Sequence, residues 1–188
     1  MNKKFELLLD DTITIFGIKL FRIKALISFG NVEEGEIGGY VEKEDNLSSS
    51  GNAWVYGNAW VSGNARVYGN AMVSGDARVY GNAEVYGNAW VYGDAWVYGN
   101  AMVSGDARVS GNARVSGNAD YIVFKNHWSS GRYFTYTKSN KMWRVGCFYG
   151  TGQELIKKAY QDSEVSGKHY EAYVEFVEKL EKLEETND

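Results

Sequence analysis

Histidine and cysteine, which commonly act in catalysis, are scarce in this chain of 188 residues. It has two histidines, His127 and His169, and one cysteine, Cys147. His127 is the one candidate for a general base, but no carboxylate lies next to it to orient the ring. Cys147 lies between Val145 and Phe148 in an expected strand, which predicts a core residue and not a nucleophile. Phosphate-loop and triad motifs are absent from the sequence, so we expect no catalytic residue and no cofactor.

Two aspartates, Asp76 and Asp94, are the weak candidates for a metal site. They replace the asparagine that occupies the equivalent repeat position at Asn58 and Asn112. Two close carboxylates can hold Ca²⁺, which prefers oxygen ligands. Asp is also a common corner residue, and the nearby Arg78 can offset the repulsion between the two carboxylates. We therefore predict no metal.

The side chains best suited to ligand binding recur at a constant interval. Trp60, Arg78, Trp96 and Arg114 follow one another at steps of eighteen residues. If these positions stack, each guanidinium lies between indole rings. That arrangement suits the stacking of a planar base or the binding of an anion.

A second candidate ligand site lies at Phe148–Gln153, which is expected to join a strand to a helix. Backbone N–H groups at a helix N-terminus bind anions. Cationic and aromatic side chains flank this junction. The candidate residues there are Lys141, Trp143, Arg144, Tyr149, Thr151 and Gly152.

Twelve consecutive six-residue units from Gly51 to Ile122 must position the stacked columns. A short fixed period predicts a solenoid, in which each unit buries its apolar atoms against its neighbours. Alternation along each unit places Ala and Val inside, and residues such as Trp54 and Tyr56 outside. The Gly-Asn pairs form the corners, because both residues tolerate positive φ.

The pattern Val-x-Gly-Asn-Ala-x resembles the hexapeptide repeat of left-handed parallel β-helix proteins, the bacterial hexapeptide-transferase superfamily. The resemblance implies left-handed, triangular coils of eighteen residues and a homotrimer. The period alone also allows a flat coil of twelve residues. Enzymes of this superfamily use acyl-CoA and a catalytic histidine near a subunit interface. The hexads contain neither a histidine nor an inserted loop, so an acyltransferase using His127 is an alternative to a binding protein.

Three outward faces follow from coils of eighteen residues. Face one carries Trp54, Met72, Trp90 and Arg108; face two carries Trp60, Arg78, Trp96 and Arg114; face three carries Arg66, Glu84, Met102 and Asp120. Faces one and two are rich in aromatic residues, and a contiguous patch of this kind marks an interface or a binding site. Coverage by the C-terminal helices is a further explanation. The expected homotrimer interface consists of Trp54, Tyr56, Met72, Trp90 and Tyr92.

The chain divides into an N-terminal β cap (1–32), the β-helix (33–122) and a C-terminal β-meander with two helices (123–188). In the cap, the sequence predicts two or three short strands over 4–28, with turns at Asp10-Asp11 and Gly17. After the hexads we expect strands at Tyr121–Trp128, Arg132–Thr137 and Met142–Tyr149, a helix that begins at Thr151 in a capping box with Glu154, and a helix from about Ser166 to Glu185.

The bulk composition excludes several classes of protein. A net charge of −4 argues against nonspecific nucleic-acid binding, which requires a basic surface. A single cysteine excludes an intramolecular disulfide and favours a reducing compartment. The sequence predicts no membrane span and no signal peptide, so we expect a cytoplasmic protein.

The N-terminal strands, the hexads and the stretch FTYTKSNKMWRVGCFYGTGQELIKKAY together resemble uncharacterised hexapeptide-repeat proteins encoded by phages and prophages. This resemblance implies the host cytoplasm as location. It also implies two targets, a host defence protein or a nucleotide-like small molecule that the assembly sequesters. We therefore predict a non-enzymatic, oligomeric binding protein. The alternatives are the acyltransferase and a purely structural trimeric scaffold.

Overall fold

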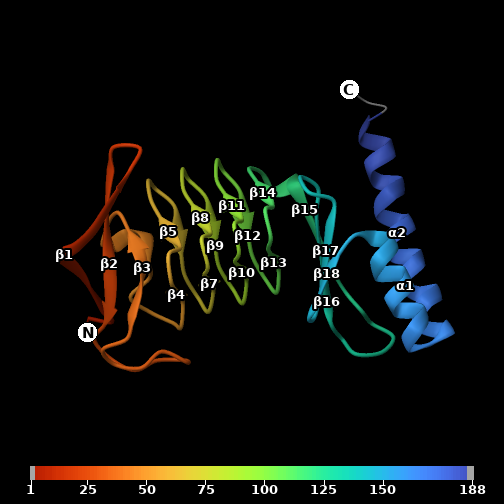
Figure 1. Cartoon of the computed structure of the whole chain (residues 1–188), viewed down its shortest axis with the longest axis horizontal. Coiled ribbons are helices and arrows are strands. Elements are labelled where there is room, and N and C mark those ends of the chain that lie inside the picture. Colours follow the sequence, from red (N-terminus) through yellow and green to blue (C-terminus); the bar gives the residue numbers. More distant parts are fainter. Residues whose placement is uncertain (1–2, 186–188) are drawn as a thin grey trace.

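The computed structural model describes residues 3–185, and its centre is a parallel β-solenoid between two antiparallel elements. Figure 1 shows the N-terminal strands at one end of the long axis and the C-terminal sheet and helices at the other. The N-terminal elements are β1 (Phe5–Ile15), β2 (Ile18–Ala25), β3 (Ile37–Val41) and a 3₁₀ turn (Glu44–Asn46). The solenoid strands are β4 (Trp54–Val55), β5 (Trp60–Val61), β6 (Arg66–Val67), β7 (Met72–Val73), β8 (Arg78–Val79), β9 (Glu84–Val85), β10 (Trp90–Val91), β11 (Trp96–Val97), β12 (Met102–Val103), β13 (Arg108–Val109) and β14 (Arg114–Val115).

Strand pairing confirms the coil of about eighteen residues. Face one is the sheet β4-β7-β10-β13, face three is β6-β9-β12, and face two is β5-β8-β11-β14, which β3, β2 and β1 extend at one edge. Trp96 pairs with Arg78 on one side and with Arg114 on the other. Each strand therefore pairs with the strand three hexads away, which excludes the flat coil of twelve residues.

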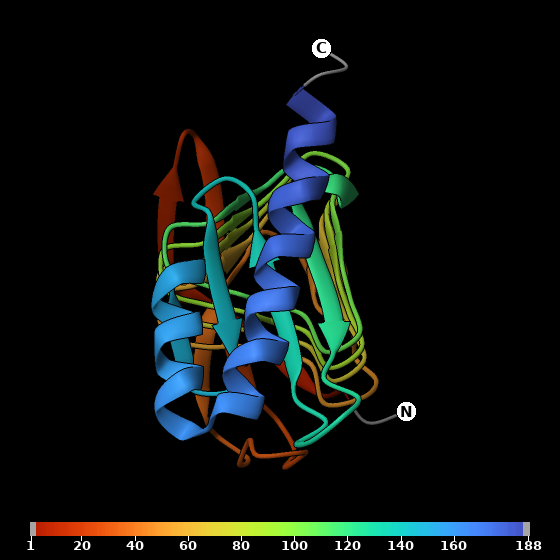
Figure 2. The same cartoon turned by 90° about the vertical axis from the view of Figure 1, so that its right-hand side faces the viewer.

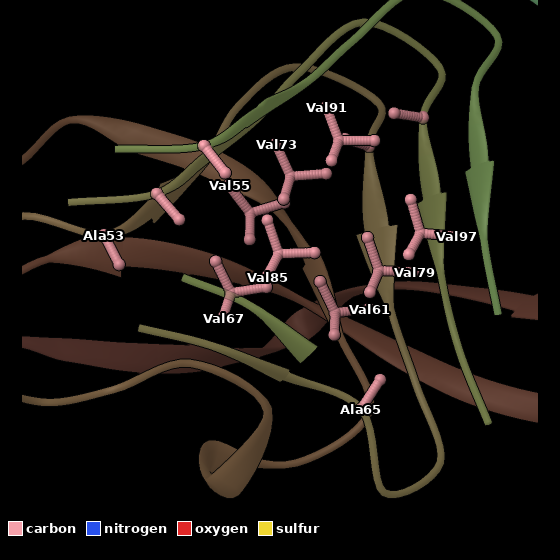
Figure 3. Packing of buried hydrophobic residues seen from close by; sticks show 14 of the residues in the cluster. Ala53, Val55, Val61, Ala65, Val67, Val73, Val79, Val85, Val91 and Val97 are labelled. Carbon is pink, nitrogen blue, oxygen red and sulfur yellow. The ribbon is translucent and has the colours of Figure 1, made fainter. Parts of the chain in front are cut away.

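The interior of the solenoid is built from the repeated Ala and Val side chains. All of these residues from Ala53 to Val115 are fully buried. Figure 3 shows the valines of successive coils in contact along the tube. The predicted inward and outward assignment of the hexad positions is confirmed.

The twelfth hexad departs from the predicted pattern. Its Asn118–Asp120 segment forms a 3₁₀ turn, and the chain then enters β15 (Tyr121–Lys125) of an antiparallel sheet. The Asp120 carboxylate accepts hydrogen bonds from the backbone N–H groups of Ser116 (2.6 Å) and Gly117 (2.9 Å). These bonds stabilise a turn that ends the solenoid, so the regular repeats stop at Val115 and not at Ile122.

The N-terminal residues form a long β-hairpin that lies on the edge of face two. The predicted turn at Gly17 is confirmed, because Phe16 and Gly17 have φ values of 49° and 80°. The predicted turn at Asp10-Asp11 is wrong. Both residues lie inside β1, where the register shifts between Leu8 and Thr12 as in a β-bulge.

The C-terminal module is a four-stranded sheet with two helices on its outer side. Its strands are β15, β16 (Tyr133–Thr137), β17 (Met142–Val145) and β18 (Phe148–Gly150), and its helices are α1 (Gly152–Asp162) and α2 (Glu164–Glu185). Figure 2 shows the helices in front of this sheet and the coils behind it. Neither described helix has the combination of length and apolar character that a membrane span requires.

The predicted single strand Met142–Tyr149 is wrong, because a turn at Gly146 (φ 57°) divides it into β17 and β18. This turn exposes Cys147, so the prediction that it is a core residue is wrong. The predicted capping box of α1 is confirmed: the Thr151 hydroxyl accepts a hydrogen bond from the Glu154 N–H (3.3 Å). Helix α2 begins at Glu164, two residues before the predicted start.

Side chains accept a hydrogen bond from one backbone N–H on each face of the last coil, which has no following coil to pair with. Met102 N–H donates to Asn118 Oδ1 (2.8 Å) on face three. Arg108 N–H donates to Thr135 Oγ1 (3.0 Å) on face one, and Arg114 N–H donates to Ser139 Oγ (2.8 Å) on face two. Each bond replaces a ladder bond, because a buried backbone donor requires a partner.

The first coil is closed in the complementary way, through its carbonyl groups. Lys4 Nζ donates to the Ala53 carbonyl (2.7 Å) on face one. The Tyr40 N–H of β3 donates to the Ala59 carbonyl (2.9 Å) on face two, and Asn46 Nδ2 donates to the Ala65 carbonyl (2.8 Å) on face three. Both ends of the tube are therefore capped within a single chain, and β1 of the hairpin is the outer strand of the face-two sheet.

Candidate ligand-binding face

The alternating Trp and Arg side chains of face two stack as predicted. The Arg78 guanidinium lies 4.7 Å from the Trp96 ring centroid and 5.9 Å from that of Trp60. Arg114 lies over the other side of Trp96, at 3.8 Å. The parallel register produces this order, since it places residues eighteen apart on adjacent strands. The column is a ladder of cation–π contacts.

A tyrosine column runs beside the ladder. Tyr80 and Tyr98 stack with their ring centroids 5.3 Å apart, and Tyr80 also stacks on Trp60 at 5.6 Å. Burial and Tyr98 raise the pKa of Tyr80, whereas Arg114 and Arg78 lower it. The Tyr80 phenol therefore lies close enough to both guanidinium groups to interact with their charges. Tyr80 and Tyr98 are not among the predicted ligand residues, although they follow the same spacing of eighteen residues.

One end of the ladder is closed by the chain itself. Trp60 is 7 % exposed and packs with Leu20 and Tyr40, so the prediction that it contacts a ligand is wrong. The β1–β2 hairpin covers this coil because it extends the face-two sheet. The open part of face two therefore consists of Arg78, Tyr80, Trp96, Tyr98 and Arg114, a set that we call the ladder surface.

The two guanidinium groups of the ladder surface are held in place but not neutralised. Among residues 3–185, neither Arg78 nor Arg114 has a hydrogen-bond acceptor or a carboxylate partner for its side chain. Indole rings restrain both side chains through their faces and leave the N–H donors free. Such a pair can bind an anion with little further loss of side-chain freedom.

The predicted site at the strand–helix junction does not form. Trp143 is 2 % exposed, in a core cluster with Phe134 and Leu155, and is therefore not available for stacking on a ligand. The fold places it there because β17 lies between the last coil and the helices. A Cβ on Gly152 would lie 2.7 Å from Val174 Cγ1, so helix α2 closes the N-terminus of α1.

The remaining residues of this junction already have partners or point elsewhere. The Thr151 hydroxyl and N–H are bonded to Glu154 within the capping box. The Arg144 guanidinium lies 5.3 Å from the Tyr92 ring on face one. Tyr149 lies against Gly111, and Lys141 is exposed in the turn before β17. Arg144 and Tyr149 are cross-strand partners next to Tyr92, whereas Trp143 is buried and the Thr151 groups are bonded within the capping box. The predicted residues therefore do not form one joint site.

The predicted interface on face one is largely covered by the chain. Trp54 is fully buried against Phe5 and Phe29, with ring centroids 6.3 and 5.4 Å away, so its assignment to a subunit interface is wrong. Tyr56 is partly buried and packs against the solenoid core. Tyr92 lies under Arg144, as described above. Met72 is half-buried and Trp90 is 41 % exposed, and the homotrimer stays a prediction.

The catalytic candidate His127 and the metal candidates Asp76 and Asp94 do not lie in groups of described residues that could form a catalytic or metal site. His127 is exposed, and its Nδ1 lies 3.4 Å from the Tyr173 hydroxyl, with no carboxylate beside it in the described chain. Asp76 and Asp94 are exposed, and Asp76 accepts a hydrogen bond from Asn58 Nδ2 (3.3 Å). Within residues 3–185, no group of three or more His, Cys, Asp or Glu side chains could hold a metal ion.

Sequence reasoning missed the residues that close the solenoid. Lys4 and Asn46 are buried polar side chains, with relative exposures of 1 % and 0 %. A single lysine and a single asparagine next to the end of a solenoid form no recognisable sequence pattern. Their role depends on carbonyls of Ala53 and Ala65, which lie 49 and 19 residues away along the chain.

Comparison with known proteins supports the repeat architecture. A family model described as YdcK Beta solenoid repeat matches residues 65–81, 77–93, 83–99, 95–109 and 107–119. Together these matches span 65–119, which is 55 of the 188 residues; they cover regular coils and end in the turn that follows Val115. The chain is therefore similar to this family in its β-solenoid repeat, of which it has about four turns. No curated protein matches the chain.

Proposed function

We propose that this protein is a non-enzymatic binding protein that holds an anionic, nucleotide-like ligand on the ladder surface. The proposal rests on how the guanidinium groups of Arg78 and Arg114 are held and on which partners they have. Both guanidinium groups are positioned by Trp96, at 4.7 and 3.8 Å, and neither has an acceptor among the described residues. If the Arg–Trp contacts only stabilised the fold, there would be no reason for two arginines that lack an acidic partner to stack on the same indole.

The spacing of the two arginines indicates the size of the ligand. Arg78 and Arg114 lie on either side of the strand that carries Trp96. Two strand spacings of about 4.8 Å place their backbones about 10 Å apart. A molecule with two phosphate groups, or with one phosphate and one planar base, can reach both guanidinium groups. The tyrosine column supplies ring faces beside them.

We also propose that the chain belongs with the phage-encoded hexapeptide-repeat proteins of the hexapeptide-transferase superfamily, because the hexads and the tail stretch resemble them. In that setting the protein acts in the host cytoplasm as an oligomer and removes a small anion from solution. A host defence protein with an acidic surface is the other ligand class that two unpaired arginines can recognise.

A thermal-shift screen tests this proposal. Mononucleotides, linear and cyclic oligonucleotides and acyl-CoA are added to the wild type, to the Arg78→Gln/Arg114→Gln double variant and to Arg66→Gln. Arg66 is an exposed face-three arginine near Tyr68, so it controls for the loss of a surface charge. We expect a nucleotide to raise the melting temperature of the wild type and of Arg66→Gln, but not of the double variant.

Two results would contradict the proposal. If acyl-CoA alone raises the melting temperature and turnover is lost in His127→Ala, the protein is an acyltransferase. If no compound shifts the wild type or Arg66→Gln relative to the double variant, the ladder surface holds no nucleotide and the scaffold alternative gains support.

A further inference from the structure

A cleft of about 250 Å³ lies where face one meets the C-terminal sheet, apart from the ladder surface. One wall comes from the solenoid and the other from the start of β16 and the turn that follows β17. It is lined by Asn88, Trp90, Asp106, Arg108, Arg132, Tyr133 and Gly146. The cleft exists only because the tail folds back against the last coils, so the hexad pattern gave no indication of it.

The solenoid wall offers an indole ring and a restrained cation. Trp90 is 41 % exposed, whereas Trp54, Trp60 and Trp143 are all buried. The Arg108 guanidinium lies 5.0 Å from the Trp90 ring centroid. A hydrogen bond from Arg108 Nη1 to the Gly146 carbonyl, at 3.4 Å, connects this arginine to the turn of the tail.

The tail wall adds a second cation and a second ring. Arg132 is exposed, and its side chain has no hydrogen-bond acceptor or carboxylate partner among residues 3–185. Tyr133 is 37 % exposed. The aliphatic part of Arg132 lies beside Gly146, because a Cβ there would be 3.5 Å from Arg132 Cδ.

The one acidic group in the cleft is already engaged. Asp106 Oδ1 accepts a hydrogen bond from Asn88 Nδ2 (3.3 Å). The interaction of the Asp106 carboxylate with the Tyr133 hydroxyl also raises the pKa of that phenol. Two guanidinium groups therefore face a single carboxylate that has its own partners, and the cleft carries an excess of positive charge.

We infer that this cleft is a second binding site, for a small planar aromatic anion that stacks on Trp90 and pairs with Arg108 and Arg132. Indole and phenol rings favour a planar ring, and paired guanidinium groups favour phosphate or carboxylate. The volume is below the range of about 300–1,000 Å³ typical of pockets for drug-sized ligands. A single ring with one anionic group therefore fits the cleft better than a dinucleotide does.

Titration of ¹⁵N-labelled protein with phenyl phosphate tests the inference. The six tryptophan indole N–H groups give separate signals, and the signal lost in Trp90→Phe identifies Trp90. We expect phenyl phosphate and benzoate to shift the Trp90 signal in a saturable way. Phenol, which lacks the anion, and inorganic phosphate, which lacks the ring, should bind at least tenfold more weakly.

Matched variants separate this cleft from the ladder surface. Arg132→Gln, at an exposed position that does not affect the core, should weaken phenyl phosphate binding about tenfold, the loss of about 1.4 kcal/mol. Arg114→Gln should leave it unchanged. The inference is overturned if the Trp90 signal does not move, if Arg132→Gln binds as tightly as the wild type, or if Arg114→Gln removes binding. None of these outcomes depends on whether a nucleotide binds to face two.

Discussion

Lys4 and Ala53 are joined by a buried hydrogen bond of 2.7 Å between the Lys4 ammonium and the Ala53 carbonyl. The ammonium also lies 4.2 Å from the Phe29 ring centroid and donates to the Ser48 carbonyl at 3.2 Å. The side chain thus occupies the position that a preceding strand would take on face one. Burial lowers the pKa of Lys4 from 10.5 to about 8.

This burial predicts that stability rises with pH. Below pH 8 both the folded and the unfolded chain carry the Lys4 proton, and the full cost of the buried charge is present. Between pH 8 and pH 10.5 the unfolded chain binds more protons than the folded chain, so the free energy of unfolding increases with pH. The whole increase amounts to about 3 kcal/mol at about 1.4 kcal/mol per pKa unit.

Denaturant unfolding between pH 8 and pH 10 measures this slope. We expect Lys4→Met to remove it, while Lys3→Met, at the exposed neighbouring position, retains it. Higher pH is avoided because burial and the hydrogen bond to Glu84 raise the pKa of Tyr68 to about 12, which makes stability fall as unfolded tyrosines ionise. A slope that persists in Lys4→Met would show that another group is responsible.

The second prediction concerns Asn46, which closes face three. Its buried amide donates to the Ala65 carbonyl (2.8 Å) and accepts from the Lys43 N–H (3.0 Å). Asn46→Ala leaves these groups without partners and should lower the free energy of unfolding by about 1–3 kcal/mol. The matched control is Asn82→Ala, which removes exposed side-chain bonds to Asn64 and Asn100 and should cost less than half as much. Equal losses in both variants would contradict the capping role.

The third prediction compares two adjacent residues of β12. Val103 is fully buried, whereas Met102 is 39 % exposed. Val103→Gln places an amide without partners in the tube and should cost about 3 kcal/mol or more. Met102→Gln should change stability by less than about 0.5 kcal/mol. Thermal unfolding followed by circular dichroism measures both, and a reversed order would contradict the inward assignment of Val.

The fourth prediction concerns assembly. Trp54 is buried within its own chain, so the half-buried Met72 and the exposed Trp90 are the predicted face-one contacts that remain accessible to a homotrimer. Light scattering should show a trimer for the wild type and a smaller species for Met72→Arg, because a charge at the contact opposes association. A monomeric wild type at micromolar concentration would exclude the homotrimer. A trimer in both proteins would place the interface on another surface.

The solenoid could be predicted from sequence because its information is local and repeated. Val91 repeats the role of Val73 and Val109, so one correct assignment determines every coil. The stacking of Arg78 and Arg114 on Trp96 could be predicted for the same reason. The spacing of eighteen residues places these three side chains on neighbouring strands of one sheet.

The fate of the other aromatic residues could not be predicted, because it depends on how the ends of the chain fold back. Trp54 and Trp60 have the same hexad context as Trp90 and Trp96, yet N-terminal residues cover the first pair. The turn at Gly146 exposes Cys147 and brings the tail to Arg108, and an isolated Gly in an apolar segment gives no indication of that partner. Tertiary contacts between distant segments decided each of these outcomes.

Isothermal titration calorimetry on the ladder surface tests the central proposal most directly. The nucleotide that gives the largest thermal shift is titrated into the wild type, Arg78→Gln, Arg114→Gln and the double variant. If both guanidinium groups contact one ligand, each single variant should weaken binding about tenfold and the double variant about a hundredfold, at about 1.4 kcal/mol per tenfold. A double variant that binds the nucleotide with wild-type affinity would contradict the proposal that the ladder surface is the binding site.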